Sequence, residues 1–131
     1  MTEPLSYCRD RKFDLQLSAA LIHERRLGEI FTTGTLERIE LKSETWQWER
    51  TGNICVEFRC AGRPSGISTT EATCWVHELR RDDATLVWLM FPIDRLKELA
   101  RRAIRAGRWR SGAGDGGRFD VALIRLSEIL Q

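Results

Sequence analysis

Glu40 and Lys42 are the residues of this chain whose types and spacing best suit chemistry. They lie in Leu36–Glu44, where apolar and polar residues alternate as in a β-strand. Residues two apart on a strand point the same way, so a carboxylate and an ammonium group share one face. The carboxylate can hold Mg²⁺ against a phosphodiester, while the lysine orients the attacking water and offsets charge on the phosphate. The tripeptide Glu-x-Lys is weakly specific, because it also occurs as an ordinary surface ion pair.

Two further carboxylates are candidates for the same site. Glu57 lies on the charged face of a second strand, predicted over Ile54–Cys60 after a turn. Glu24 lies within the apolar stripe of an amphipathic helix predicted from Asp14 to about Phe31. Burying a carboxylate on such a stripe is costly unless it is paired or bound to metal. Glu24 is therefore either part of the site or a stripe-edge residue paired with an arginine.

The elements that follow are predicted to alternate between helix and strand. The capping-box pattern Ser68–Glu71 predicts a second helix running into Ala72–Val76. The short apolar run Thr85–Phe91 predicts a strand covered on both faces and ended by Pro92. A third helix capped by Asp94 and ended by Gly107, a glycine-rich loop over residues 112–117 and a last strand over Phe119–Leu126 complete the order. We therefore expect an α/β (α+β) domain.

Positive charge and aromatic residues mark candidate contacts for nucleic acid. Residues 95–110 carry a strong excess of arginine and lysine, which suits phosphates but also suits a solvated helix face. Two tryptophans in the polar turn after the first strand are suited to stack on an unpaired base. The candidate nucleic-acid-binding residues are Arg101, Arg102, Arg105, Arg108, Trp46, Trp48 and Arg50.

The sequence as a whole resembles the small phage and prophage members of the PD-(D/E)xK, or restriction-endonuclease-like, nuclease superfamily. The resemblance covers roughly residues 15–126 and follows Ile39–Glu44, Thr51–Ile54, Val56–Glu57 and Gly62–Ala72 in order. Its Thr-Gly-Asn and Pro-Ser-Gly-Ile blocks are far more specific than Glu-x-Lys. The resemblance implies a central mixed β-sheet flanked by helices, in the order helix, three strands, helix, strand.

The resemblance also implies roles for individual residues. Glu40 matches the second acidic position and Lys42 the lysine, and the main-chain carbonyl of Leu41 joins the acids as a metal ligand. Glu24 matches a glutamate of the first helix. The family pattern places an aspartate upstream of Glu-x-Lys, but residues 15–42 contain none.

The first metal ligand is therefore left open among Glu24, Glu29 and Glu57. The function implied is that of a DNA endonuclease or exonuclease dependent on Mg²⁺ or Mn²⁺. The alternative is a catalytically inactive module of the same fold that binds DNA or a protein.

Length and composition fit one domain over residues 1–131, in which we expect residues 1–12 to be flexible or poorly packed. The net charge is only +2, and no apolar run approaches the roughly 20 residues that span a membrane. Neither a signal nor a transit pattern opens the chain. We expect a cytoplasmic protein that binds DNA but no membrane, with a homodimer as one option.

The four cysteines, at positions 8, 55, 60 and 74, are irregularly spaced, which favours reduced thiols over a disulfide framework. A zinc-stabilised interaction domain is a third hypothesis, with Cys55, Cys60, Cys74 and His77 as ligands and the last two on one helix face. It is disfavoured because structural zinc sites prefer tight Cys-x-x-Cys pairs. Buried thiols and a satisfied histidine are the expected alternative.

Overall fold

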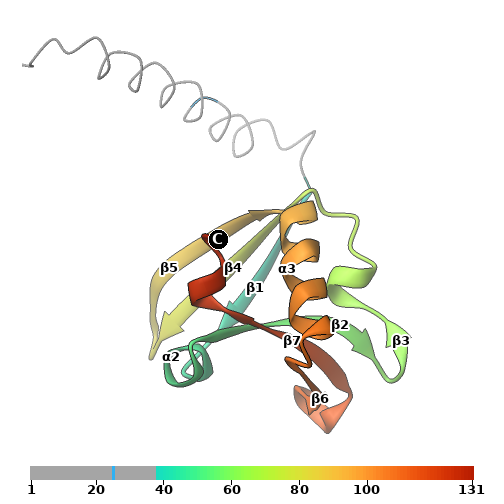
Figure 1. Cartoon of the computed structure of the whole chain (residues 1–131). Helices are drawn as coiled ribbons and strands as arrows, with labels where there is room; N and C mark the ends of the chain where they lie inside the picture. Colours follow the sequence, from blue (N-terminus) through green and yellow to red (C-terminus); the bar gives the residue numbers. More distant parts are fainter. Residues whose placement is uncertain (1–24, 26–37) are drawn as a thin grey trace, which may run out of the picture. The chain divides into compact units, whose positions relative to one another are not determined.

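The computed structural model describes Arg25 and residues 38–131, and the latter lie within one compact unit, Glu37–Gln131. This described part is an α+β structure with seven strands in two sheets (Figure 1). Of the helix predicted over residues 14–31, only Arg25 is described, and it is helical; Glu24 and Glu29 lie outside the described residues.

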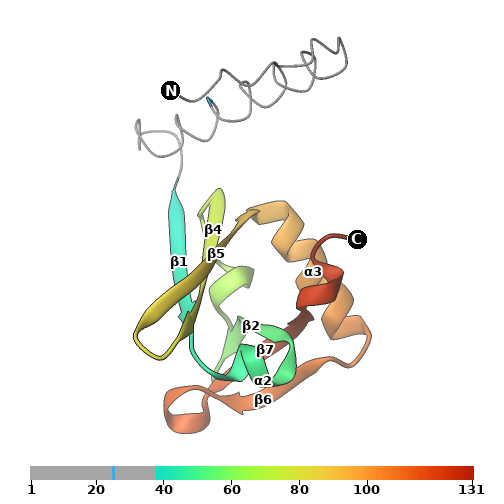
Figure 2. The same cartoon turned by 90° about the vertical axis from the view of Figure 1, so that its left-hand side faces the viewer.

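The first sheet is mixed and has the order β1-β4-β5. Its strands are β1 (Ile39–Glu44), β4 (Cys74–Arg81) and β5 (Ala84–Pro92). β1 runs parallel to β4, and β5 runs antiparallel to β4 (Figure 2). β1, which carries Glu40 and Lys42, lies at one end of this sheet among the described residues.

The second sheet is antiparallel and has the order β3-β2-β7-β6. Its strands are β2 (Asn53–Cys60), β3 (Arg63–Pro64), β6 (Trp109–Ala113) and β7 (Phe119–Arg125). The strands predicted over 54–60 and 119–126 are confirmed as β2 and β7. The short helix α2 (Gln47–Thr51) connects β1 to β2, and Gly52 ends it in the left-handed conformation. Residues 112–117 were predicted as a glycine-rich loop, but residues 112 and 113 belong to β6. They extend as a strand because β6 pairs with β7 in a hairpin.

The long helix α3 (Ile93–Arg105) confirms the prediction from helical periodicity. Leu96, Leu99, Ala100 and Ala103 are buried along one side, as their spacing requires. The helix ends where Arg108 N donates to the Ala103 carbonyl at 2.8 Å around the glycine at position 107, a Schellman-type stop. The expected Asp94 cap is wrong, because the structure has no side-chain capping bond at this end.

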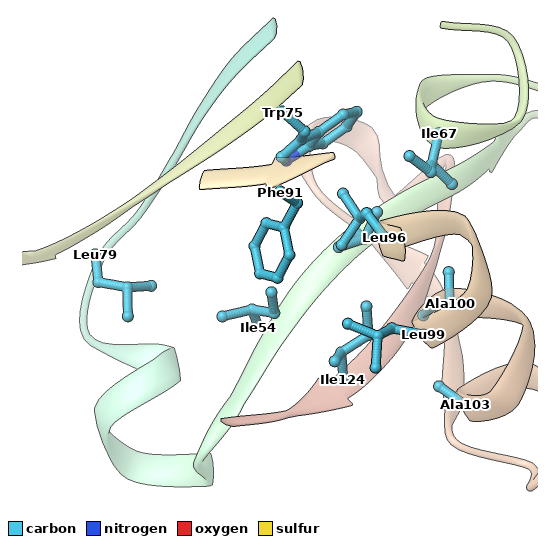
Figure 3. Packing of buried hydrophobic residues seen from close by; sticks show 12 residues of the cluster. Ile54, Ile67, Trp75, Leu79, Phe91, Leu96, Leu99, Ala100, Ala103 and Ile124 are labelled. Carbon is cyan, nitrogen blue, oxygen red and sulfur yellow. The ribbon is translucent and has the colours of Figure 1, made fainter. Parts of the chain in front are cut away.

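One hydrophobic core joins α3 to both sheets (Figure 3). Trp75 and Phe91 enter it from the first sheet, and Ile54 and Ile124 enter it from the second. Leu96 and the other buried α3 residues point from the helix toward these side chains (Figure 3). Burial of each such large side chain contributes about 1.5–3 kcal/mol, so the sheets are held together through this core.

The second helix predicted from Ser68–Glu71 is wrong, because this region leads into β4 after the 3-10 turn η1 (Gly66–Ser68). Thr70 Oγ1 accepts a hydrogen bond from Ala72 N at 3.1 Å, so the hydroxyl stabilises a turn and caps no helix. Residues 74–77 are all buried, as in a strand between two neighbours. A short run of apolar residues has the same sequence pattern in a strand buried on both faces as in a buried helix, so periodicity does not distinguish the two.

β5 is also less covered than its apolar sequence predicts. Leu86, Val87 and Trp88 are 46%, 41% and 67% exposed. Within the described residues, β5 has a strand neighbour only on its β4 side. The expectation of a strand covered on both faces is therefore wrong for this stretch.

Candidate active site

The charged face of β1 is the one turned toward buried residues. Glu40 pairs in register with Trp75, and Lys42 pairs with His77, so these four side chains point to the same side of the sheet. Trp75 and His77 are each only 1% exposed. The opposite face of β1 carries Leu41, which is 59% exposed. The predicted sharing of one face by Glu40 and Lys42 is therefore confirmed, and this face leads inward.

Glu40 and Lys42 contact each other directly. Lys42 Nζ lies 3.2 Å from Glu40 Oε1, and Thr70 Oγ1 donates to Glu40 Oε2 at 2.6 Å. The Lys42 ammonium also lies 5.9 Å from the centre of the Trp75 ring. These contacts orient both side chains, although the lysine remains about half exposed.

Lys42 and Glu57 line one cavity of about 530 Å³, although β1 and β2 belong to different sheets. Glu44 and Asp115 also line it, whereas Glu40 does not. The Glu57 carboxylate forms no ion pair with any other residue in the described part of the chain. Three carboxylates against one lysine make the lining attractive to a cation and, without one, repulsive to a phosphodiester.

A buried hydrogen-bond chain closes one wall of this cavity. Trp75 Nε1 donates to His77 Nδ1 at 3.2 Å, which leaves His77 Nε2 to donate to Glu44 Oε2 at 2.8 Å. The other Glu44 oxygen accepts from Cys55 N at 2.8 Å, so this carboxylate links the two sheets. Both ring nitrogens of His77 are occupied, which confirms the expectation of a satisfied histidine.

Of the three described cysteines, Cys74 is buried as expected, whereas Cys55 and Cys60 are only partly buried. Burial, followed by the neighbouring Glu44 carboxylate, raises the pKa of the Cys55 thiol to about 12. A protonated thiol is a poor nucleophile and a poor metal ligand. None of Cys55, Cys60 and Cys74 takes part in a disulfide within the described residues.

The structure also removes the geometric basis of the zinc hypothesis. Cys74 and His77 were expected on one helix face, but they lie three apart on β4 and therefore on opposite faces. Among residues 38–131, no group of three or more histidine, cysteine, aspartate or glutamate side chains is arranged to hold a metal ion.

Two residues near the cavity had not been predicted as part of the site. Gly66 approaches β2 so closely that a Cβ there would lie 2.3 Å from the Glu57 carbonyl oxygen. The Pro-Ser-Gly-Ile block therefore positions Glu57. In the sequence, the glycine of this block was the feature that could have indicated the close contact. Asp115 opens the turn η2 (Asp115–Gly117), where it is the one acid among small, flexible residues.

The basic residues predicted to bind nucleic acid fall into two groups. Arg102 is paired with Glu98 at 2.6 Å, and Arg108 is paired with Glu128 at 2.8 Å. Arg101 and Arg105 are exposed and have no ion pair with any other described residue. The charges of Arg101 and Arg105 are therefore available for phosphate, whereas those of Arg102 and Arg108 are already partly neutralised.

The two tryptophans predicted to contact nucleic acid differ in their exposure. Trp46 is 58% exposed, with the Arg50 guanidinium 5.1 Å from its ring centre. Trp48 packs against the core and donates from Nε1 to the Arg80 carbonyl at 2.8 Å. Of the two, Trp46 is the one whose ring is accessible for stacking.

Comparison with protein-family models, with curated proteins and with solved structures found no match to this chain. Within the described residues, no helix has both the length and the apolar character needed to cross a membrane.

Proposed function

We propose that this protein is a metal-dependent deoxyribonuclease of PD-(D/E)xK type, with Glu40, Lys42 and Glu57 as its catalytic group. The observation that carries the proposal is the acidic cavity, which is lined by Lys42 from one sheet and by Glu57 from the other. Glu57 has no ion pair among the described residues. The proposal implies a restriction-endonuclease-like core, with the β4–β5 hairpin in the region where the second helix was predicted.

The donor set suits Mg²⁺ or Mn²⁺. Glu57 supplies hard carboxylate oxygens to the cavity lining. Glu40 and the main-chain carbonyl of Leu41 are the further proposed ligands, and the Glu40 carboxylate would have to turn from Lys42 and Thr70 to join them. Mg²⁺ commonly binds through one or two carboxylates and otherwise keeps water and substrate phosphate, so a larger protein cage is unnecessary. When bound, the ion would neutralise the phosphodiester and acidify a water molecule.

Lys42 has the contacts needed to position the nucleophile. Its ammonium group is held between the Glu40 carboxylate and the Trp75 ring, and it lines the cavity beside Glu57. From there it would donate a hydrogen bond to the attacking water or to a phosphate oxygen as negative charge develops. Glu24, which lies outside the described residues, stays a predicted further ligand.

A catalytically inactive DNA-binding module is the second candidate, and one observation favours it. The Glu40 carboxylate is engaged by Lys42 and Thr70 and does not line the cavity. The two candidates share the DNA partner and differ in turnover.

A cleavage assay on supercoiled, branched and single-stranded DNA, with Mg²⁺, Mn²⁺ or EDTA, separates the candidates. We expect cleavage that needs the metal and that Lys42→Ala abolishes. The Lys42–Glu40 pair is partly exposed and contributes at most about 1 kcal/mol, so this variant should remain folded. DNA binding without cleavage of any substrate would favour the inactive module.

Glu57→Gln tests the metal site against a matched control. The amide keeps the shape of the side chain but is a poorer ligand for a hard cation, so Mg²⁺ affinity should fall. Glu49→Gln is the control, because Glu49 pairs with Arg81 on the surface and does not line the cavity. Equal Mg²⁺ titrations for the two variants would remove Glu57 from the site.

A further inference from the structure

A second groove, of about 260 Å³, lies between α3 and the turn η1. One side is basic, with Lys97 and Arg101 spaced one helical turn apart on α3. The other side is largely apolar, with Phe58 of β2 and Ile67 of η1. The groove shares no lining residue with the larger cavity, so it is a separate feature of the surface.

The cations of this groove are available, unlike Arg95 and Arg102 on the same helix. Arg95 and Arg102 both pair with Glu98, at 2.9 and 2.6 Å. Lys97 and Arg101 form no ion pair within the described part of the chain. Desolvating a cation that has no protein partner sacrifices no existing ion pair. Arg105 shares this property, but only Lys97 and Arg101 line the groove.

The apolar side of the groove continues into an aromatic pair, over which the Arg59 guanidinium lies 5.4 Å from the Phe58 ring centre and 5.7 Å from the Trp109 ring centre. The Phe58 ring lies 6.0 Å from the Trp109 ring in an edge-to-face arrangement, and Trp109 is 40% exposed. The groove is smaller than the roughly 300–1,000 Å³ pockets that enclose drug-sized ligands. Its size suits one flat group, such as a base, held against an aromatic ring next to a backbone phosphate.

We propose that this groove binds single-stranded DNA, with phosphates at Lys97 and Arg101 and a base against Phe58. That the polymer is DNA rests on the proposed nuclease function. A single strand is favoured over a duplex because a stacked, paired base presents no free face to an aromatic ring. A purely electrostatic surface would need no apolar side and would prefer the higher charge density of a duplex.

The test is a binding titration in EDTA, so that its result does not depend on cleavage. The probe is an oligothymidylate of about 15 nucleotides, compared with a duplex and with an abasic strand of the same length. Lys97→Gln/Arg101→Gln is compared with Arg95→Gln/Arg102→Gln, which removes the same charge from the same helix. Thermal unfolding of both double variants checks that they remain folded.

We expect the oligothymidylate to bind more tightly than the duplex, and about tenfold more tightly than the abasic strand. Lys97→Gln/Arg101→Gln should lower the slope of log affinity against log salt by about 1.4, which corresponds to two lost contacts on a single strand. The control pair should change this slope much less. Equal effects of the two double variants, or equal affinity for the duplex or the abasic strand, would overturn the proposal. Absence of nuclease activity with these binding results intact would refute only the proposed function.

Discussion

Gly66→Ala tests directly how the fold positions Glu57. Gly66 has a φ of +54°, a left-handed conformation that costs an L-residue about 1–2 kcal/mol. A Cβ there would lie 2.3 Å from the Glu57 carbonyl oxygen and 2.9 Å from the Glu57 Cβ. These neighbours are parts of a paired strand, so they cannot rotate away as the end of a long side chain would. Overpacking of this kind costs about 1–3 kcal/mol more.

The expected loss of unfolding free energy is therefore about 2–5 kcal/mol, measured by urea denaturation. Gly52→Ala is the matched control, because Gly52 has a φ of +72° and nothing within 4 Å of an added Cβ. It should lose only the conformational part, about 1–2 kcal/mol, and should keep its Mg²⁺ affinity. Gly66→Ala should also weaken Mg²⁺ binding, because β2 must shift at Glu57. Equal destabilisation by the two substitutions would show that the close approach of Gly66 to Glu57 contributes nothing.

Three further predictions concern the core and the cavity wall. Glu44→Ala should cost about 2–6 kcal/mol in urea denaturation, because it leaves the His77 ring and Cys55 backbone N–H groups without acceptors. Glu44→Gln should lower the unfolding free energy less, since its amide keeps one acceptor oxygen. A larger loss for Glu44→Gln than for Glu44→Ala would contradict these hydrogen bonds. With a pKa of about 12 against a usual 9.0, Cys55 should react with iodoacetamide at pH 8 much more slowly than a peptide thiol, because a far smaller fraction of it is thiolate. Folding stability should also fall as pH rises above 9, because the unfolded thiol releases a proton that the folded thiol keeps. Stability that does not change with pH in this range, or fast alkylation of Cys55, would argue against the raised pKa. Leu99→Ala should cost about 2–5 kcal/mol through the cavity it leaves, and a negligible change in the urea midpoint would exclude this core position.

Local patterns in the sequence predicted the elements whose two faces differ. The alternation in β1 and β2 and the helical stripe of α3 each separate apolar from charged residues. β6 and β4 were missed or misassigned for a common reason. β4 is buried on both faces over Cys74–His77, and β6 is largely exposed, so neither carries the two-residue period. Pairing with strands distant in sequence determines both.

The sequence likewise predicted only part of the candidate site. The sequence alone places Glu40 and Lys42 on one face, because the geometry of a strand repeats every two residues. Only the tertiary structure brings Lys42, Glu57 and Asp115 to one cavity, because these residues lie on separate elements whose meeting depends on how the two sheets pack. The same packing turned the charged face of β1 inward and left Leu41 exposed. Strand period determines which side chains point together, whereas the burial of either face depends on contacts made by the rest of the chain.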